Sequence, residues 1–135
     1  VDRTKIVQDL VKYALKESHH IAADLGIPKS ERVLENLWVN INPKYSYNQA
    51  HVHPEARLSG VFYVDAPEKS GDICFSRDNG YALGTVCPEM TRYSVAEYCY
   101  PPKKNRLLIF PAWLEHHVKA NLSEEDRISI SFNIR

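Results

Sequence analysis

The C-terminal segment RISISFNI (127–134) constrains the fold more than any other part of the sequence. Its side chains alternate strictly between polar and apolar, which is the period of a β-strand with two different faces. One interpretation is an ordinary strand whose polar face meets solvent. The other is a strand whose polar face lines a small barrel, where an arginine beside hydroxyls would bind the carboxylate of a ligand. The apolar face comprises Ile128, Ile130, Phe132 and Ile134, and the polar face comprises Arg127, Ser129, Ser131 and Asn133.

Further short runs rich in branched and aromatic residues precede this segment, and Gly, Pro, Asn and Asp separate them. No helical pattern lies between these runs, which favours a β-sandwich or barrel over a parallel sheet. Glycine and proline are frequent between residues 78 and 104, so we expect a long loop there, with a strand near residues 91–100. The runs are LWVNI (37–41), LSGVFYV (58–64), GDICFS (71–76) and RLLIFPAWL (106–114).

In the first third of the chain, the pattern of apolar residues predicts a helix rather than strands. In TKIVQDLVKYALKE (4–17) apolar residues recur at helical spacing with charges between them, so one face of this helix should pack against a sheet. Gly26 and Pro28 mark a break after it. A second short helix is expected in SERVLENL (30–37), with Ser30 as its N-cap.

Length and charge narrow the possible functions. A chain of 135 residues is long enough for one domain with its own core, so we expect a single domain over residues 1–135, with a helical flank (1–37) and a β core (37–135). Lys plus Arg and Asp plus Glu number 17 each, so no overall charge favours nucleic acid or an anionic membrane. No apolar run reaches membrane-spanning length, and the N-terminus lacks the apolar core of a signal peptide.

Two smaller features concern the ends and the cysteines. The chain begins with Val1 rather than Met, so a preceding piece is expected. Its three cysteines, Cys74, Cys87 and Cys99, are an odd number without close paired spacing. This pattern predicts reduced thiols and a cytoplasmic protein rather than a disulfide framework.

The stretch HVHPE (51–55) predicts a metal site. Residues two apart on a strand point the same way, so His51 and His53 can face one ion, and Glu55 shares that face if Pro54 does not break the strand. Imidazole and carboxylate ligands with open positions are typical of non-haem iron(II). A distant histidine would complete the site, and FPAWLEHH (110–117) offers two at the end of a strand-like run, His116 and His117.

From residue 37 to the end, an ordered series of motifs resembles the iron(II)- and 2-oxoglutarate-dependent dioxygenases, in particular a branch known only as presumed oxygenases. Each motif alone is weak, and their order makes the resemblance specific. The motifs are W-x-N (38–40), N-x-x-H-x-H-P (48–54), LSGVFYV (58–64), SGDICF (70–75), FPAWLEH (110–116) and RISISFN (127–133).

The resemblance implies a double-stranded β-helix, a jelly-roll barrel with the N-terminal helices packed on one sheet. It implies iron(II) bound by an H-x-D/E…H triad whose distal histidine is His116. It also implies 2-oxoglutarate bound through Arg127, helped by Ser129, with Tyr63 and Asn40 as further contacts to the co-substrate or the inner wall. The expected reaction consumes O2 and hydroxylates a peptide side chain or a small metabolite, with release of succinate and CO2.

The sequence departs from this pattern at the acid. His51-Val52-His53 has a histidine where a carboxylate is expected, whereas His53-Pro54-Glu55 satisfies H-x-E. Two ligand sets therefore stay open: three histidines (His51, His53 and His116), or Glu55 as the alternative ligand in place of His51.

Two other functions compete with this one. A cupin-like three-histidine metal enzyme or binding protein would not use 2-oxoglutarate, and could take its late ligands from His117 and Asn121. In that scheme Arg127 has no task. A barrel that has lost its metal and binds only a partner is the third hypothesis. The oligomeric state is not readable from the sequence.

Overall fold

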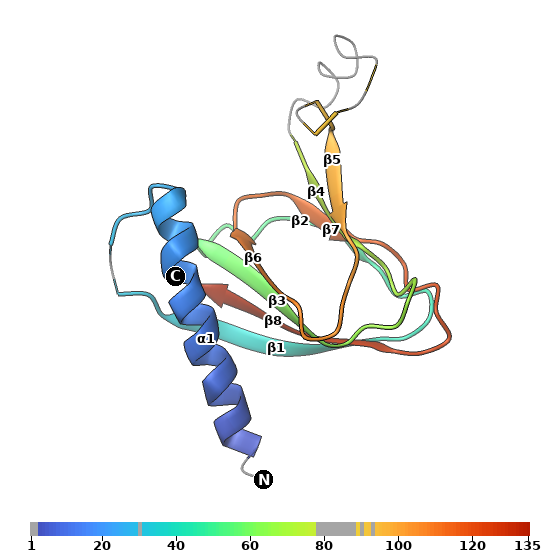
Figure 1. The fold of residues 1–135 in the computed structure, drawn as a ribbon, viewed down its shortest axis with the longest axis horizontal. Coiled ribbons are helices and arrows are strands. Elements are labelled where there is room, and N and C mark those ends of the chain that lie inside the picture. Colours follow the sequence, from blue (N-terminus) through green and yellow to red (C-terminus); the bar gives the residue numbers. More distant parts are fainter. Residues whose placement is uncertain (1–2, 30, 78–88, 90, 93) are drawn as a thin grey trace.

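The computed structural model describes residues 3–29, 31–77, 89, 91–92 and 94–135. One long helix precedes eight strands, and all the strand pairings are antiparallel (Figure 1). The predicted mostly β fold is confirmed. The elements are α1 (Arg3–Asp24), β1 (Leu34–Asn42), β2 (Asn48–His51), β3 (Leu58–Asp65), β4 (Ile73–Ser76), β5 (Glu97–Tyr100), β6 (Leu107–Pro111), β7 (His116–Val118) and β8 (Arg127–Ile134).

The strands form two four-stranded sheets in a jelly-roll arrangement. One sheet has the order β1-β8-β3-β6, and the other has the order β2-β7-β4-β5. Apart from β4 and β5, neighbours in each sheet are not consecutive strands in the sequence, as β1 beside β8 illustrates. The two sheets face each other, and α1 lies against the outer side of the first one (Figure 1). Two apolar clusters follow from this layering, one between helix and sheet and one between the sheets.

Helix α1 is longer than the sequence predicts, and only part of its apolar stripe is buried. Ala14 and Ala22 pack into the cluster that includes Phe132 and Ile134 of β8, whereas Ile6 near the N-terminus is 60% exposed. The helix ends where Gly26, with φ +71°, allows the amide of Ile27 to reach the carbonyl of Ala22 at 2.8 Å. The predicted break at this glycine is confirmed.

The predicted second helix over residues 30–37 is wrong. Leu34 begins β1, and Leu37 and Val39 pair with Phe132 and Ile130 of β8. Long-range pairing with β8 outweighs a helical preference that spans only two turns. Ser30, its expected N-cap, lies outside the described residues.

The cysteine prediction also needs correction. Cys74 and Cys99 are directly opposite each other on β4 and β5 and form a disulfide, so the predicted reduced thiols are wrong for these two residues. A separation of 25 residues gives no sign of this pairing, because the antiparallel register alone brings them together.

The expected strand near residues 91–100 is confirmed as β5, whereas most of the expected loop lies outside the described residues, as does Cys87. Within the described residues, no helix is long and apolar enough to cross a membrane.

Candidate metal and anion site

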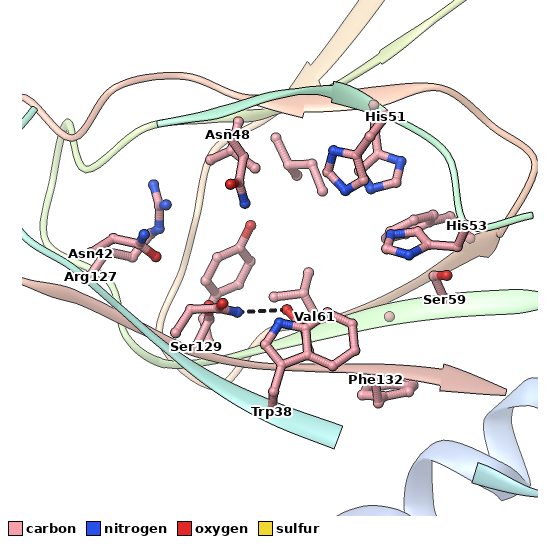
Figure 2. Close-up of a pocket in the computed structure, with 18 residues that line it drawn as sticks. Trp38, Asn42, Asn48, His51, His53, Ser59, Val61, Arg127, Ser129 and Phe132 are labelled. Carbon is pink, nitrogen blue, oxygen red and sulfur yellow. Dashed lines mark hydrogen bonds between the residues drawn. The ribbon is translucent and has the colours of Figure 1, made fainter. Parts of the chain in front are cut away.

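A cavity lies between the two sheets, and side chains from both of them line it (Figure 2). Imidazoles gather at one end, and a guanidinium lies at the other end (Figure 2). On β1 the cavity side carries Trp38, Asn40 and Asn42, whereas Val39 and Ile41 on the opposite face are 59% and 62% exposed. The polar side chains of this strand therefore face inward, which is the reverse of a strand that covers an ordinary apolar core.

Three histidines converge at one end of the cavity. His51 ends β2 and pairs directly with His116 at the start of β7, and His53 follows two residues later. Their ring centroids are 4.3 Å (His51–His116), 4.9 Å (His51–His53) and 5.2 Å (His53–His116) apart. One nitrogen from each ring lies within 4.8 Å of the other two, so the three could hold one metal ion.

Hydrogen bonds set the tautomers of two of these rings. Nδ1 of His51 lies 2.7 Å from the carbonyl of Gln49, and Nδ1 of His116 lies 2.9 Å from the carbonyl of Leu114. A carbonyl can only accept, so each Nδ1 carries the proton and donates it. Each Nε2 then has a free lone pair, which is the arrangement that a metal-binding histidine needs.

Burial favours the neutral form of two of these imidazoles. It lowers the pKa of His116 to about 4, although the hydrogen bond to the Leu114 carbonyl acts to raise it, and the neighbouring histidines lower it further. Burial also lowers the pKa of His53, with a smaller contribution from His51. Neutral imidazole is the form that binds a cation, so the environment of His53 and His116 favours metal binding.

Glu55 does not join this cluster. The strand ends at His51, and the chain turns at once, with the amide of Ala56 donating to the carbonyl of His53 at 3.2 Å. Glu55 is exposed on that turn and lines a separate surface hollow beside Pro54. His117 is also absent from the cluster, because alternation along β7 turns it to the other face of the sheet from His116.

The opposite end of the cavity holds Arg127, which is 3% exposed. Its Nη1 donates to the carbonyls of Ser70 and Gly71, the second at 3.2 Å. Among the described residues no carboxylate pairs with it. A buried cation without a counter-ion is costly, so this end of the cavity favours an anionic ligand.

The other predicted contacts surround this guanidinium. Tyr63 and Ser129 are buried and line the cavity. Burial raises the pKa of Tyr63 to about 12 although Arg127 acts to lower it, so the phenol remains a hydrogen-bond donor at neutral pH. The side-chain amide of Asn40 donates to the hydroxyls of Ser131 (2.8 Å) and Ser129 (3.4 Å).

Ser131 lines the cavity, as the polar face of its strand predicted, whereas Asn42 and Asn48 were not predicted as lining residues. Period-two alternation could have found Asn42, since it follows Asn40 on the same strand face. No pattern marks Asn48, because it belongs to a short strand on the other sheet.

Fold and site together define a jelly-roll protein with a candidate metal centre and an anion site at opposite ends of one cavity. The chain belongs to the family described as "Putative 2OG-Fe(II) oxygenase", whose model matches residues 36–133. That family consists of enzymes, and iron(II) and 2-oxoglutarate are its cofactors. A search of curated proteins finds no match.

Solved structures of such oxygenases share the fold. An oxidoreductase of the 2OG-Fe(II) oxygenase family from Burkholderia pseudomallei is 13% identical, with a TM-score of 0.63, and the match covers 79% of this chain and 46% of that one. A prolyl-4-hydroxylase from Pseudomonas putida is 18% identical (TM-score 0.54; 76% and 52% covered). HygX from Streptomyces hygroscopicus, solved with nickel and 2-oxoglutarate bound, is 12% identical (TM-score 0.56; 78% and 58% covered). The chain thus spans roughly half the length of these proteins.

The residues present fit both cofactors. Three imidazoles, with Nε2 free on His51 and His116, form a donor set that suits iron(II). The guanidinium of Arg127 in the same cavity has no carboxylate partner in the part of the chain that the structure describes, and it suits a dicarboxylate.

Proposed function

We propose that the protein is an iron(II)- and 2-oxoglutarate-dependent oxygenase that hydroxylates a peptide side chain or a small metabolite. The observation that carries this proposal is the pairing of a metal-binding cluster with a buried cation that has no carboxylate partner among the described residues. A metal site alone would suit many functions. An anion in the cavity together with the metal would supply the counter-ion that Arg127 lacks among the described residues.

In this proposal His51, His53 and His116 hold the iron, and Glu55 is not a ligand. Arg127 binds the far carboxylate of 2-oxoglutarate, and the protonated phenol of Tyr63 and the hydroxyl of Ser129 donate to the same group. When bound, the two cofactors supply the oxidising chemistry, in which O2 converts the keto acid to succinate and CO2 and hydroxylates the substrate. The protein orients the reactants and excludes water from the cavity.

The substrate would approach at the imidazole end. Trp38 is 37% exposed there, and its ring centroid lies 6.4 Å from that of His53. An exposed aromatic ring beside the metal site suits a peptide side chain or a small organic molecule. The balance of 17 basic and 17 acidic residues disfavours nucleic acid as a substrate. The cytoplasmic location stays a prediction, and the Cys74–Cys99 disulfide argues against it.

The test is to mix metal-free protein anaerobically with iron(II) and 2-oxoglutarate and to record the visible charge-transfer band of a chelated keto acid. We expect the band in the natural protein and in Glu55→Gln, and its loss in His53→Gln and His116→Gln. Admission of O2 should then convert 2-oxoglutarate to succinate. Bound iron without the band would contradict the proposal.

A three-histidine enzyme of the cupin type is the second candidate, because the metal cluster contains no carboxylate. Its additional late ligands would be His117 and Asn121. Asn121 is fully buried, and its amide donates to the carbonyls of Asn42 (2.9 Å) and Glu125 (2.8 Å), which is a structural task. Iron binding without any affinity for 2-oxoglutarate would favour this candidate. If iron(II) or manganese(II) fails to raise the melting temperature, the protein is a barrel without a metal.

A further inference from the structure

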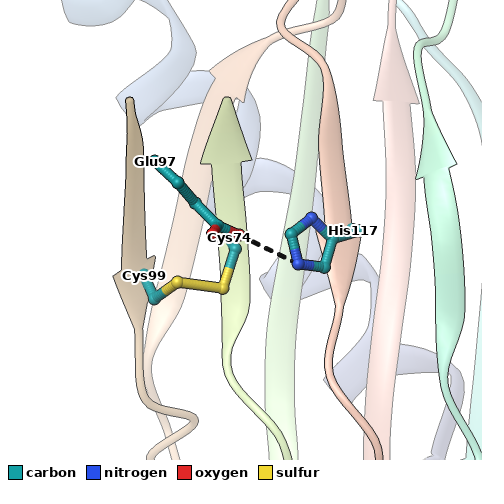
Figure 3. The surroundings of a disulfide bond; sticks show 4 residues. All are labelled: Cys74, Glu97, Cys99 and His117. Carbon is teal, nitrogen blue, oxygen red and sulfur yellow. Dashed lines mark ion pairs between the residues drawn. A yellow bond between two sulfur atoms is a disulfide. The ribbon is translucent and has the colours of Figure 1, made fainter. Parts of the chain in front are cut away.

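A second group of metal-ligating side chains lies on the other face of the sheet β2-β7-β4-β5, away from the cavity. We call Cys74, Cys99, Glu97 and His117 the outer cluster (Figure 3). The sulfurs of Cys74 and Cys99 and a carboxylate oxygen of Glu97 all lie within 4.8 Å of one another. Nε2 of His117 lies 2.9 Å from Oε1 of Glu97.

Strand register explains why these four side chains converge. Cys74 on β4 is opposite Cys99 on β5 and also opposite His117 on β7, so the three form one row across three strands. Glu97 lies two residues before Cys99 and therefore points to the same face. Strand β4 separates β5 from β7, yet Glu97 and His117 touch. Their side chains must reach toward each other across β4, the strand that carries Cys74.

The outer cluster is separate from the three-histidine cluster. His116 and His117 are neighbours on β7 and point to opposite faces of the sheet. Phe75, the residue after Cys74, contacts the ring of His116 on the cavity side. Two chemically different groups of ligands thus lie back to back on one sheet, one with nitrogen atoms alone and one with two sulfurs.

We propose that the reduced outer cluster is a zinc site, with Cys74, Cys99, His117 and Glu97 as its ligands. Two thiolates, an imidazole and a carboxylate are all ligands that Zn²⁺ takes in tetrahedral sites. Such ligands lie about 2.0 to 2.3 Å from the ion, which places ligand atoms about 3.3 to 3.8 Å from one another. On reduction the two sulfurs would separate to this range, and His117, which lies 2.9 Å from Glu97 but outside the group within 4.8 Å of both sulfurs, would turn toward them.

The exposed fractions of the four side chains suit an ion that is shielded from solvent on its cysteine side and accessible to solvent on the side of His117 and Glu97. Cys74 is fully buried, whereas the side chains of His117 and Glu97 are 29% and 41% exposed. The ion would attach β5, the last strand of its sheet, to both β4 and β7. In the sheet β5 pairs with β4, and the ion pair between Glu97 and His117 already links β5 to β7, so the ion would replace that ion pair with a shared metal.

Zinc and the disulfide exclude each other, because the S–S bond uses both thiolates. An external disulfide such as oxidised glutathione would drive the exchange. The two zinc-bound thiolates form the Cys74–Cys99 bond and give up two electrons, and the external disulfide takes these electrons and becomes two thiolates, which take protons from solvent. The ion then leaves with only two protein ligands remaining. The disulfide described above is the oxidised state of this site.

The test uses cobalt(II) as a spectroscopic substitute for zinc in the full chain. Protein reduced with a phosphine and kept anaerobic should develop a near-ultraviolet thiolate-to-cobalt band, and zinc should abolish it. Protein with the disulfide intact should show no such band. The three-histidine cluster contains no sulfur and cannot produce this signal, so the result is independent of the proposed oxygenase activity.

Variants identify the ligands. Cys99→Ser should remove the band, whereas Cys87→Ser should retain it. His117→Gln should weaken cobalt binding at least about tenfold, and His20→Gln, on the exposed surface of α1, should leave it unchanged. No band in the reduced natural protein, or an equal band in the oxidised protein, would overturn the proposal. An unchanged band in Cys99→Ser would also overturn the proposal. If that variant does not fold, the comparison of reduced with oxidised natural protein still tests whether the metal binds the two thiolates.

Discussion

Arg127→Met tests the anion site most directly. Methionine keeps an unbranched apolar stem of similar reach, so the packing around β8 should change little while the positive charge disappears. Both hydrogen bonds that Arg127 donates within the described part of the chain come from Nη1, so Nη2 and Nε remain for a ligand. Loss of a hydrogen bond to a charged group costs about 1.5 to 3 kcal/mol. That range corresponds to a Kd for 2-oxoglutarate about 10- to 150-fold weaker.

The assay is an anaerobic titration of the iron(II)-loaded protein with 2-oxoglutarate, followed by calorimetry or by the visible band. Affinity for the metal itself should stay the same, because Arg127 lies at the other end of the cavity from the histidines. The matched control is Arg106→Met. Arg106 also donates to a backbone carbonyl, that of Pro101 at 2.9 Å, but it does not line the cavity. An unchanged Kd in Arg127→Met, or an equal loss in Arg106→Met, would refute the reasoning.

Three further predictions follow from the same structure. Glu55→Gln should change the Kd for manganese(II) by no more than about twofold, whereas His53→Gln should raise this Kd at least about tenfold. Calorimetry on metal-free protein measures both values. The reverse order of effects would make Glu55 the ligand. The pKa of His116 is lowered in the folded protein. As the pH falls, this histidine therefore takes up its proton at a higher pH in the unfolded chain than in the folded protein. Metal-free protein should therefore lose on the order of 2 to 3 kcal/mol of unfolding free energy between pH 6.5 and pH 4, and urea titrations should show a smaller loss in His116→Gln. Gly71→Ala should lower the unfolding free energy by at least about 2 kcal/mol. The reason is that Gly71 has φ +104° and a Cβ there would lie 2.1 Å from the carbonyl oxygen of Lys119. An unchanged melting temperature would contradict this prediction.

Some of the fold was readable because the pattern is local. The alternation in RISISFNI predicted both the strand and its polar inner face, and the cavity is indeed lined by Arg127, Ser129 and Ser131. Helix α1 was equally readable from its spacing. The failure at residues 34–37 has a physical reason. Short apolar segments are compatible with helix or strand, and the partner strand β8, about 90 residues away, decides between them.

The sequence by itself determined which chemical groups are present: an H-x-H pair, a late histidine, and an arginine on the polar face of a strand. Tertiary structure decided which of them meet. Pairing of β2 with β7 brings His51 to His116, and the turn after His53 carries Glu55 away from them. The register of β4 and β5 joins Cys74 to Cys99 in the same way. Spacing along a strand fixes the direction of a side chain, whereas contact depends on strand pairings between distant segments, which no local pattern encodes.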